Sequence, residues 1–332
     1  MGNQGCHQKT FLSFYLFFTI KTDFMEKSNF NMHRRNFVRA LSLGTAHLVF
    51  SPPLTACRAN NTDTDPVQRV KLGDSGITTS LLGIGTGVHA GNRTAFLTRQ
   101  DKQKSLDLLH HAYNRGIRYF DCADTYGTHG LVAEAIKKMD RSELTLATKI
   151  WVRKGGIPEA ERPDAHIVVD RFRKELNTDY LDIVQIHCMV EADWTDSQKK
   201  QMDILENLKA KGIIKAHGVS VHSLEAMRNA LESPWVDVIH VRINPFGIAM
   251  DKPDPEEVVQ VIHKMHTSGK GVIGMKLVGN GELRNDSKKI DQSIRFVLGL
   301  GSVDMVIVGF EENNQIDNYL GRMKHTLTEL RG

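Results

Sequence analysis

The stretch "RYFDCADTYG" (residues 118–127) begins as a short apolar strand and ends in polar side chains directly before a glycine. Asp121 closes the apolar run, and Asp124 and Tyr126 follow it in the next few positions. A strand buried on both faces is apolar along its length, so an acidic residue at its end needs a reason beyond packing. The stretch therefore indicates a buried strand whose carboxyl end carries functional side chains.

The rest of the chain repeats this alternation of apolar runs and amphipathic stretches. In residues 102–116 and 164–177, apolar residues recur every three or four positions, and the stretches end at Gly116 and Asn177, as helices do. The apolar runs are TTSLLGIG (78–85), IRYFDC (117–122), LTLATKI (144–150), LDIVQIH (181–187), IIKAHGVS (213–220), VDVIHVRI (236–243), GVIGMKL (271–277) and VDMVIVGF (303–310).

Strands that alternate with helices over residues 68–332 predict an α/β fold of one domain, a (β/α)₈ TIM barrel. A doubly wound open sheet is the alternative, but the glycines of "GIGTG" (83–87) lack the spacing of a dinucleotide-binding fingerprint. In a barrel, the carboxyl ends of the strands meet at one mouth, where polar residues indicate chemistry rather than packing.

Composition and charge exclude several classes of protein. The chain has 332 residues, 40% hydrophobic and 25% charged, which is ordinary for a globular protein and excludes a disordered or collagen-like chain. The net charge of +4 comes from residues 1–57, because the remainder has equal numbers of basic and acidic side chains. Without a basic surplus, the domain is not expected to bind nucleic acid.

The N-terminal region resembles a bacterial export signal. Residues 32–57, "MHRRNFVRALSLGTAHLVFSPPLTAC", contain the arginine pair of a twin-arginine signal and end like a lipobox. Cys57 is then the lipidated first residue of an exported protein, periplasmic or anchored at the outer face of a membrane, and residues 58–67 form a linker. A surface helix with an arginine pair is the alternative. We interpret residues 1–31 as an upstream extension or a mis-set start; a genuine first anchor is the rival, although "FLSFYLFFTI" (11–20) is too short to span a bilayer.

After Cys57 the sequence contains two cysteines, Cys122 and Cys188, beside the strand ends discussed next. Export permits a disulfide, but spacing alone does not bring the two together. We expect two buried free thiols.

Four polar residues stand at the ends of successive predicted strands. Asp121 closes the second strand, Tyr126 lies in the loop behind it, Lys149 interrupts the third strand and His187 ends the fourth. Taken separately, Tyr126 fits a loop aromatic, Lys149 a strand-edge charge and His187 a core histidine. A buried lysine needs a carboxylate partner, however, and the succession of all four indicates a catalytic group.

The segments "RYFDCADTYG", "LATKI", "DYLDIVQIH" and "AHGVS" resemble the successive signatures of the aldo-keto reductase superfamily, from about residue 68 to the C-terminus. The resemblance implies a barrel enzyme that transfers hydride between a nicotinamide cofactor and a carbonyl or alcohol. It also implies a catalytic tetrad at Asp121, Tyr126, Lys149 and His187. Asp124 is left over, and we interpret it as a turn or solvent residue.

The chemistry justifies these residue types independently. Hydride transfer to a carbonyl leaves an alkoxide, which needs a proton donor such as Tyr126. Because a phenol is a weak acid, we expect the Lys149 ammonium to lower its pKa and Asp121 to hold Lys149 charged and in place. His187 is expected to orient the substrate oxygen or assist the proton transfer.

The resemblance also implies a cofactor site. "GVIGMKLVGNGEL" (271–283) resembles the loop that wraps the pyrophosphate, and "IVGFEENNQI" (307–316) resembles the segment that opens the last helix. The implied cofactor-binding residues are Gly85, Thr86, Ser220, Met275, Lys276, Leu277, Gly279, Gly281, Gly309, Phe310, Glu311, Asn313 and Gln315. Three positions depart from the family: Val221 follows Ser220 where many members have asparagine, Met275 replaces a stacking tyrosine, and a glutamine is replaced around Arg242.

The segment after the last strand bears on the choice between NAD and NADP. NADP-preferring members carry lysine or arginine there, whereas Glu311 and Glu312 would repel a 2′-phosphate. We expect NAD or NADP, with NAD favoured, and Lys276 or Arg322 as substitutes for the missing clamp. The remaining residues suffice for one helix. Trp151 and Trp194 follow the third and fourth strands and are expected to line the substrate mouth; packing within the loops is the alternative.

Two other functions remain open from the sequence. Export separates the protein from the cytoplasmic cofactor pool, which favours a tightly held cofactor and a redox-neutral isomerase, epimerase or lyase. A non-catalytic binding subunit is the third hypothesis. His217, His222 and His240 lack metal-ligand spacing, so no metal is expected. The expected partner is a small-molecule carbonyl or alcohol, with the membrane reached only through the lipid anchor.

Overall fold

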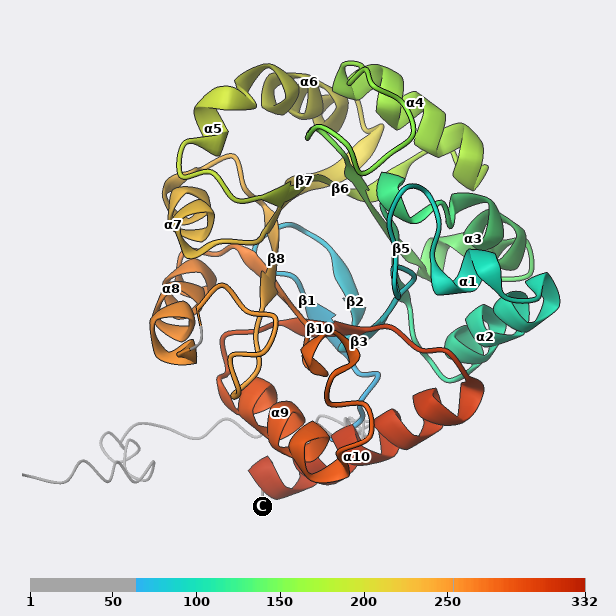
Figure 1. Ribbon diagram of the computed structural model, residues 1–332, viewed down its shortest axis with the longest axis vertical. Helices are drawn as coiled ribbons and strands as arrows, with labels where there is room; N and C mark the ends of the chain where they lie inside the picture. Colours follow the sequence, from blue (N-terminus) through green and yellow to red (C-terminus); the bar gives the residue numbers. More distant parts are fainter. Residues whose placement is uncertain (1–63, 253, 332) are drawn as a thin grey trace, which may run out of the picture. The chain divides into compact units, whose positions relative to one another are not determined.

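Eight parallel strands close into a barrel (Figure 1). They are β3 (Leu82–Gly85), β4 (Tyr119–Asp121), β5 (Thr145–Ile150), β6 (Leu181–Met189), β7 (Ile214–Val221), β8 (Val238–Arg242), β9 (Gly271–Met275) and β10 (Met305–Val308). Each strand pairs with the next in sequence, and β10 pairs with β3 to complete the ring. The predicted barrel is confirmed, and the open doubly wound sheet is excluded.

The computed structural model describes residues 64–252 and 254–331, all within one compact unit of the chain, Ala59–Gly332. The predictions for residues 1–31, for the export signal in residues 32–57 and for Cys57 lie outside the described residues. Within those described ranges, no helix is long and apolar enough to cross a membrane.

Helices surround the barrel on its outer side (Figure 1). They are α1 (Phe96–Arg99), α2 (Lys102–Asn114), α3 (His129–Ile136), α4 (Ala165–Leu176), α5 (Trp194–Ser197), α6 (Lys199–Ala210), α7 (Leu224–Glu232), α8 (Pro255–Thr267), α9 (Ser287–Gly299) and α10 (Asn313–Arg331), with 3₁₀ turns η1 (Asp124–Tyr126), η2 (Arg141–Glu143) and η3 (Gly279–Gly281). The single helix expected after the last strand is α10.

Helix α4 illustrates how the sequence specifies these elements. Its buried residues, among them Val168, Phe172 and Leu176, recur at helical spacing and face the barrel. Asn177 ends the helix in the left-handed region at φ 49°, and its N–H bonds back to the last turn. The period of the apolar residues and the asparagine together set the face and the end of α4.

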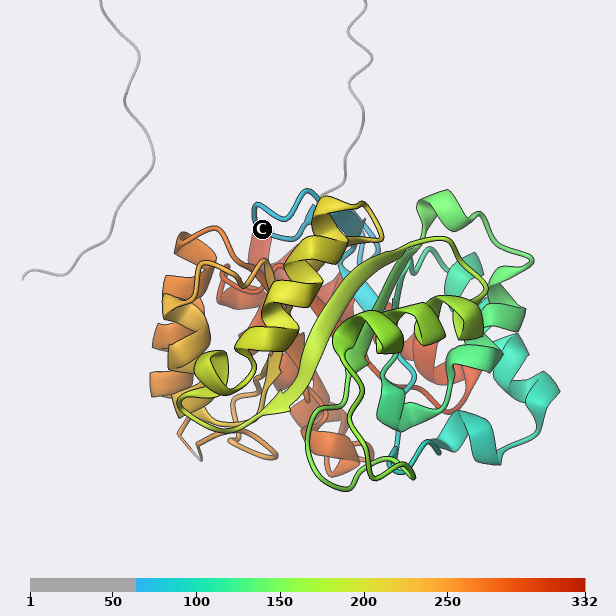
Figure 2. The same ribbon diagram turned by 90° about the horizontal axis from the view of Figure 1, so that it is seen from above.

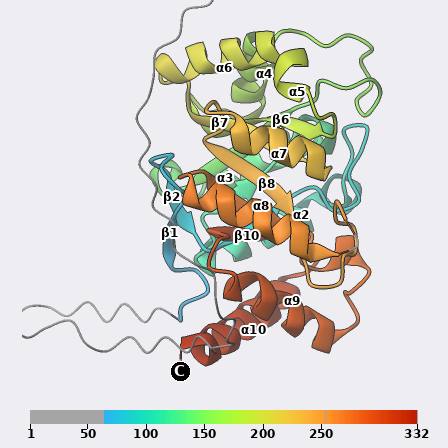
Figure 3. The same cartoon turned by 90° about the vertical axis from the view of Figure 1, so that its left-hand side faces the viewer.

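The first predicted strand, residues 78–85, is in fact two strands. Its first part, β2 (Thr78–Ser80), pairs antiparallel with β1 (Arg69–Lys71), and only Leu82–Gly85 enters the barrel. The hairpin lies at the end of the barrel where the strands begin (Figures 2 and 3). Leu72 and Ile77 from its turn join the interior apolar cluster, so the hairpin closes that end and leaves the opposite mouth for a site.

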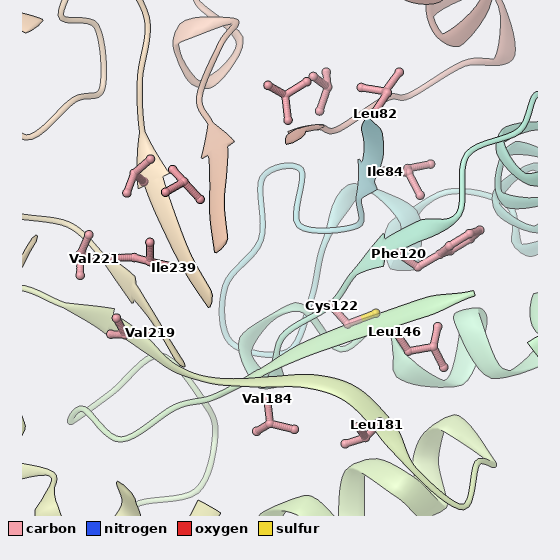
Figure 4. Close-up of a cluster of buried hydrophobic side chains, with 14 of the residues drawn as sticks. Leu82, Ile84, Phe120, Cys122, Leu146, Leu181, Val184, Val219, Val221 and Ile239 are labelled. Atoms are coloured by element: carbon pink, nitrogen blue, oxygen red, sulfur yellow. The ribbon is translucent and has the colours of Figure 1, made fainter. Parts of the chain in front are cut away.

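The strand period of two residues determines which side chains reach the barrel interior. In β4, Tyr119 joins the interior cluster, whereas Phe120 and the following Cys122 pack outward against the helices. Figure 4 shows Phe120 and Cys122 in this outer layer, beside Leu146 of β5. Asp121 is the next inward position and therefore points into the barrel toward the mouth.

Candidate active site

A buried ion pair forms the base of the mouth. Lys149 of β5 donates from Nζ to the Asp121 carboxylate and to the carbonyl oxygen of Cys122 at 3.0 Å. Both side chains are almost fully buried. Although burial raises the pKa of Asp121, the Lys149 charge and the contact with His240 outweigh it and hold that pKa at about 2. Asp121 is therefore ionised, and the predicted carboxylate partner of Lys149 is confirmed.

Tyr126 lies beside this ion pair, at the end of η1. The Lys149 Nζ atom is 5.3 Å from the centre of its ring. Gly87 packs on the other side, where a Cβ atom would come within 2.5 Å of the phenol carbon Cζ, so only glycine permits this approach. The loop after β3 thus holds the Tyr126 ring against the mouth.

The expectation that Lys149 lowers the pKa of Tyr126 is wrong in this geometry. Burial, followed by the negative charge of Asp121, raises the pKa of Tyr126 well above its usual value. The charge of Asp121 opposes that of Lys149 at this ring. The phenol is therefore held protonated, which suits a proton donor.

His187 ends the inward face of β6 and completes the group. Its ring meets Tyr126 edge-on, with ring centres 5.8 Å apart, and Trp151 edge-on at 5.3 Å. Burial and the Lys149 charge lower its pKa, so the imidazole is neutral. Its Nδ1 is buried and has no hydrogen-bond partner among the described residues. A buried polar atom without a partner is uncommon, and packing alone does not explain it.

The structure also brings in a residue that the sequence analysis considered only as a metal ligand. His240 of β8 is completely buried, and its Nε2 lies 3.3 Å from Asp121 Oδ1 and 3.4 Å from the Tyr119 hydroxyl. The two-residue period of β8 indicates this placement from the sequence, because Val238, His240 and Arg242 occupy alternate positions and therefore share one face of the strand.

Asp124 is a buried residue and not the turn or solvent residue that was expected. Its Oδ1 accepts from Arg93 Nε at 3.0 Å and its Oδ2 from Arg171 Nη2 at 2.7 Å. The backbone of Arg93 also donates to Thr125 O at 2.9 Å. Because Arg93 lies in the loop after β3 and Arg171 in α4, Asp124 ties both elements to the turn that carries Tyr126.

The two tryptophans differ in position. Trp151 is partly exposed and contacts His187, which agrees with a place at the mouth. Trp194 is fully buried, packs against Trp235 and donates from Nε1 to Ala226 O at 3.1 Å. The prediction that Trp194 lines the mouth is wrong, because α5 turns the side chain inward against α7.

The cysteines match the expectation of free thiols: Cys122 is buried and Cys188 half-buried, and neither forms a disulfide within residues 64–252 and 254–331. Cys188 Sγ instead lies 3.2 Å from His222 Nδ1. Among the described residues, no group of three or more histidine, cysteine or carboxylate side chains is placed to hold a metal ion.

Some of the implied cofactor residues have internal partners. Thr86 Oγ1 donates to Asp121 O at 2.8 Å, and Ser220 Oγ accepts from Cys188 N at 2.8 Å. The Phe310 ring is buried against Tyr319. Gln315 Oε1 accepts from Glu311 N at 2.8 Å at the start of α10. The polar side chains among these are therefore engaged with backbone groups of the protein itself.

The loop after β9 has the character of an anion site. Lys276 follows Met275 with φ 66°, and the turn continues through Gly279 and Gly281 at φ 57° and 96°. Lys276 Nζ contacts Asn280 Oδ1 at 2.8 Å and has no carboxylate partner within the described part of the chain. Burial and the nearby Arg242 lower its pKa. A half-buried cation without a counter-ion beside a glycine turn fits the diphosphate of a dinucleotide.

Arg242 and Arg322 are engaged elsewhere. Arg242 pairs with the buried Asp251 and donates to His222 O at 2.7 Å. Arg322 pairs with Asp291 at 2.7 Å. Of the two proposed substitutes for the 2′-phosphate clamp, Arg322 is therefore in an ion pair, whereas Lys276 has no carboxylate partner among the described residues.

Comparison with known proteins agrees with this geometry. The model of the Aldo/keto reductase family matches residues 81–294. The NADH-specific methylglyoxal reductase of Escherichia coli is 26% identical over 205 residues, which cover 56% of this chain and 61% of the relative. The chain spans about half to three fifths of the length of the first curated relatives that it matches.

Solved structures show the same fold. The holo form of an aldo-keto reductase from Bacillus halodurans has a TM-score of 0.62 at 20% identity, covering 80% of this chain and 96% of that one. An aldo/keto reductase from Klebsiella pneumoniae, in complex with NADP and acetate, has a TM-score of 0.57 at 17% identity, covering 80% and 94%. With the family model matching most of the barrel, the chain belongs to the aldo/keto reductase family.

Proposed function

We propose that the chain is an NAD(P)-dependent oxidoreductase that transfers hydride between a nicotinamide cofactor and a small carbonyl or alcohol. The observation that carries this proposal is the buried Asp121–Lys149 pair beside a protonated Tyr126 and a neutral His187. The name of the E. coli relative, a methylglyoxal reductase, supports the same reaction class.

When bound, the nicotinamide supplies or accepts the hydride. In the reducing direction the carbonyl oxygen becomes an alkoxide, and the Tyr126 phenol donates its proton to it. The phenolate that remains lies near the Lys149 ammonium, whose charge offsets part of the cost that burial and Asp121 impose on it. Asp121 keeps Lys149 charged and in place through its direct contact with Nζ.

His187 and Trp151 determine how the substrate lies. The neutral His187 ring stands edge-on to Tyr126, where it orients the substrate oxygen. Trp151 covers the other side of His187 and shields the reacting atoms from water.

For the cofactor, Lys276 and the turn at Gly279–Gly281 are the residues that would hold the diphosphate. We propose a preference for NAD, because Glu311 and Glu312 begin the segment that would meet a 2′-phosphate. Similar proteins are known with each of the two cofactors: the E. coli relative is NADH-specific, and the Klebsiella structure holds NADP.

The cofactor proposal is tested by denaturing the purified full chain and identifying any released nucleotide by mass and absorbance. An empty protein is then titrated with NADH and NADPH, and tighter binding of NADH is expected. Failure to bind either nucleotide would contradict the proposed function and favour a non-catalytic barrel.

The catalytic proposal is tested with Tyr126→Phe. Loss of the proton donor should lower kcat by about 10²- to 10⁴-fold and leave nucleotide affinity unchanged. Tyr113→Phe is the matched control, since the Tyr113 hydroxyl contacts Glu143 at 3.1 Å on the outer surface. Equal kcat values for the two variants would refute the role of Tyr126.

We also propose that the protein is exported as a lipoprotein, on the resemblance of residues 32–57 to a twin-arginine signal with a lipobox. Labelled fatty acid should enter the wild-type protein and not Cys57→Ala. Export also motivates the second candidate, a redox-neutral isomerase, epimerase or lyase. Stoichiometric nucleotide released from the purified chain would support it.

A further inference from the structure

His240 occupies the side of the barrel interior opposite Asp121. It lies on β8, in register with Ser220 of β7 and Ile273 of β9, and its side chain has no exposure to solvent. In the ring of eight strands, β8 is four strands away from β4 in either direction. A side chain from the far wall therefore crosses the interior to reach the carboxylate that holds Lys149.

The carboxylate selects the tautomer of His240. Its Nε2 lies 3.3 Å from Asp121 Oδ1, and burial with the Lys149 charge lowers its pKa, so the ring is neutral. A neutral imidazole has one N–H, and a lone pair on Nε2 would repel the ionised Asp121. The proton is therefore on Nε2, which donates to Asp121, and Nδ1 is a bare acceptor without a partner in residues 64–252 and 254–331.

Asp121 Oδ1 thus receives two donors from different strands, Lys149 Nζ and His240 Nε2. Lys149 Nζ is also held by the carbonyl oxygen of Cys122, whereas among the described residues the carboxylate has no side-chain donor besides Lys149 and His240. A second donor on the same oxygen, from the opposite wall, fixes the rotation of the carboxylate about its Cβ–Cγ bond. The Tyr119 hydroxyl lies 3.4 Å from Nε2, with the two ring centres 6.3 Å apart.

We propose that His240 is a positioning residue for the reaction, which fixes the Asp121 carboxylate and thereby the Lys149 ammonium beside Tyr126. The inference rests on the proposed function of the Tyr126 site. His240 touches neither the substrate oxygen nor Tyr126 in this arrangement; it acts through Asp121 and Lys149.

His240 also affects the pH at which Asp121 titrates. The groups that face His240 and Asp121 are Lys149, Tyr119, Tyr126, Cys122 and His187. A donor to an ionised carboxylate lowers its pKa, so removal of His240 raises the pKa of Asp121. Activity that requires ionised Asp121 is then lost at a higher pH than in the wild type.

The test compares three variants of the full chain. His240→Leu removes the N–H donor. His240→Asn keeps an amide donor on a side chain that is too short to reach Asp121. His240→Gln keeps an N–H donor on a side chain of similar length to histidine. We expect His240→Leu and His240→Asn to lower kcat by about 10²-fold with KM unchanged, and to move the acid limb of kcat up by about one pH unit. His240→Gln should stay within about threefold of the wild type with its acid limb in place.

The matched control is His217→Gln. His217 is equally buried on the neighbouring strand β7, but it stacks on Trp235 and contacts Glu206 at 2.8 Å on the outer side. Its substitution should change stability and leave kcat and its pH profile unchanged. The proposal is overturned if the acid limb of kcat lies at the wild-type pH in both His240→Leu and His240→Asn. If His240→Leu does not fold, the result for His240→Asn alone decides.

A measurement without turnover separates this inference from the proposed function. In the full chain with ¹⁵N-labelled histidine, the His240 ring, assigned by its loss in His240→Gln, should carry its proton on Nε2 and respond to Asp121→Asn. A proton on Nδ1 overturns the proposal. If the chain reduces no carbonyl but His240 carries its proton on Nε2 and responds to Asp121→Asn, the contact between His240 and Asp121 is supported and the proposed oxidoreductase function is refuted.

Discussion

Asp124→Asn tests whether the ion pairs around η1 position Tyr126. The substitution keeps the shape of a side chain that is 2% exposed, so it opens no cavity. It removes the charge that Arg93 and Arg171 share, and it places an amide N–H₂ against one of the two guanidinium groups. A donor then faces a donor inside a buried turn.

The magnitude follows from the contacts. A hydrogen bond to a charged group contributes about 1.5–3 kcal/mol, and one of the two is lost while the other is weakened. Both arginines are partly exposed and keep other partners, Glu159 for Arg93 and Glu175 for Arg171. These partners reduce the loss in the free energy of unfolding. We expect the free energy of unfolding to fall by about 2–3 kcal/mol, below the full cost of breaking a deeply buried pair.

The assay is urea unfolding of the full chain, with kcat measured in parallel. The free energy from urea unfolding should fall by about 2–3 kcal/mol, which corresponds to a Tm about 5–10 °C lower in thermal unfolding, and kcat should fall by about tenfold or more because η1 carries the proton donor. Asp170→Asn is the control, since Asp170 is 57% exposed and pairs with Arg173 on the surface of α4. A loss of stability and kcat no larger than in this control would refute the reasoning.

Two further substitutions test the ion pair and the tryptophans. Lys149→Met should raise the pKa of Asp121 from about 2 toward its usual 3.8 or above. The stability that the lowered pKa supplies is present above about pH 4 and is lost as the pH falls through 2, so acid unfolding followed by circular dichroism should begin at a higher pH. An unchanged acid midpoint would contradict this. Trp194→Ala should lower the free energy of unfolding by about 3–5 kcal/mol with KM unchanged, because the ring is fully buried. Trp151→Ala should instead raise KM with little effect on urea unfolding; the reverse pattern would refute both placements.

The sequence predicts most of the candidate site because the information is local. Asp121, Lys149 and His187 each lie at the inward face of a strand near its carboxyl end, and Tyr126 follows one of these ends within a short turn. A barrel places all such ends at one mouth, so their order along the chain suffices to bring them together. The strand period likewise indicates that Phe120 packs outward where Asp121 points in.

The sequence cannot reveal contacts between elements that are distant along the chain. Nothing near Asp124 shows that Arg93 and Arg171 converge on it, and nothing near Trp194 shows that α7 covers it. The division of residues 78–85 into a hairpin strand and a barrel strand depends on pairing with Arg69–Lys71. Each of these errors came from placing a residue in solvent, at the mouth or in a strand before its partner was known.

The sequence by itself thus determined the barrel, the direction in which its strands point and the four polar residues at its mouth, because periodicity and order along the chain carry that information. Closure of the barrel decided the rest. It brings β8 opposite β4, so that His240 meets Asp121, and it adds the charge of Asp121 to the burial that keeps Tyr126 protonated. Electrostatic fields and buried contacts depend on distance in space, which only the folded chain defines.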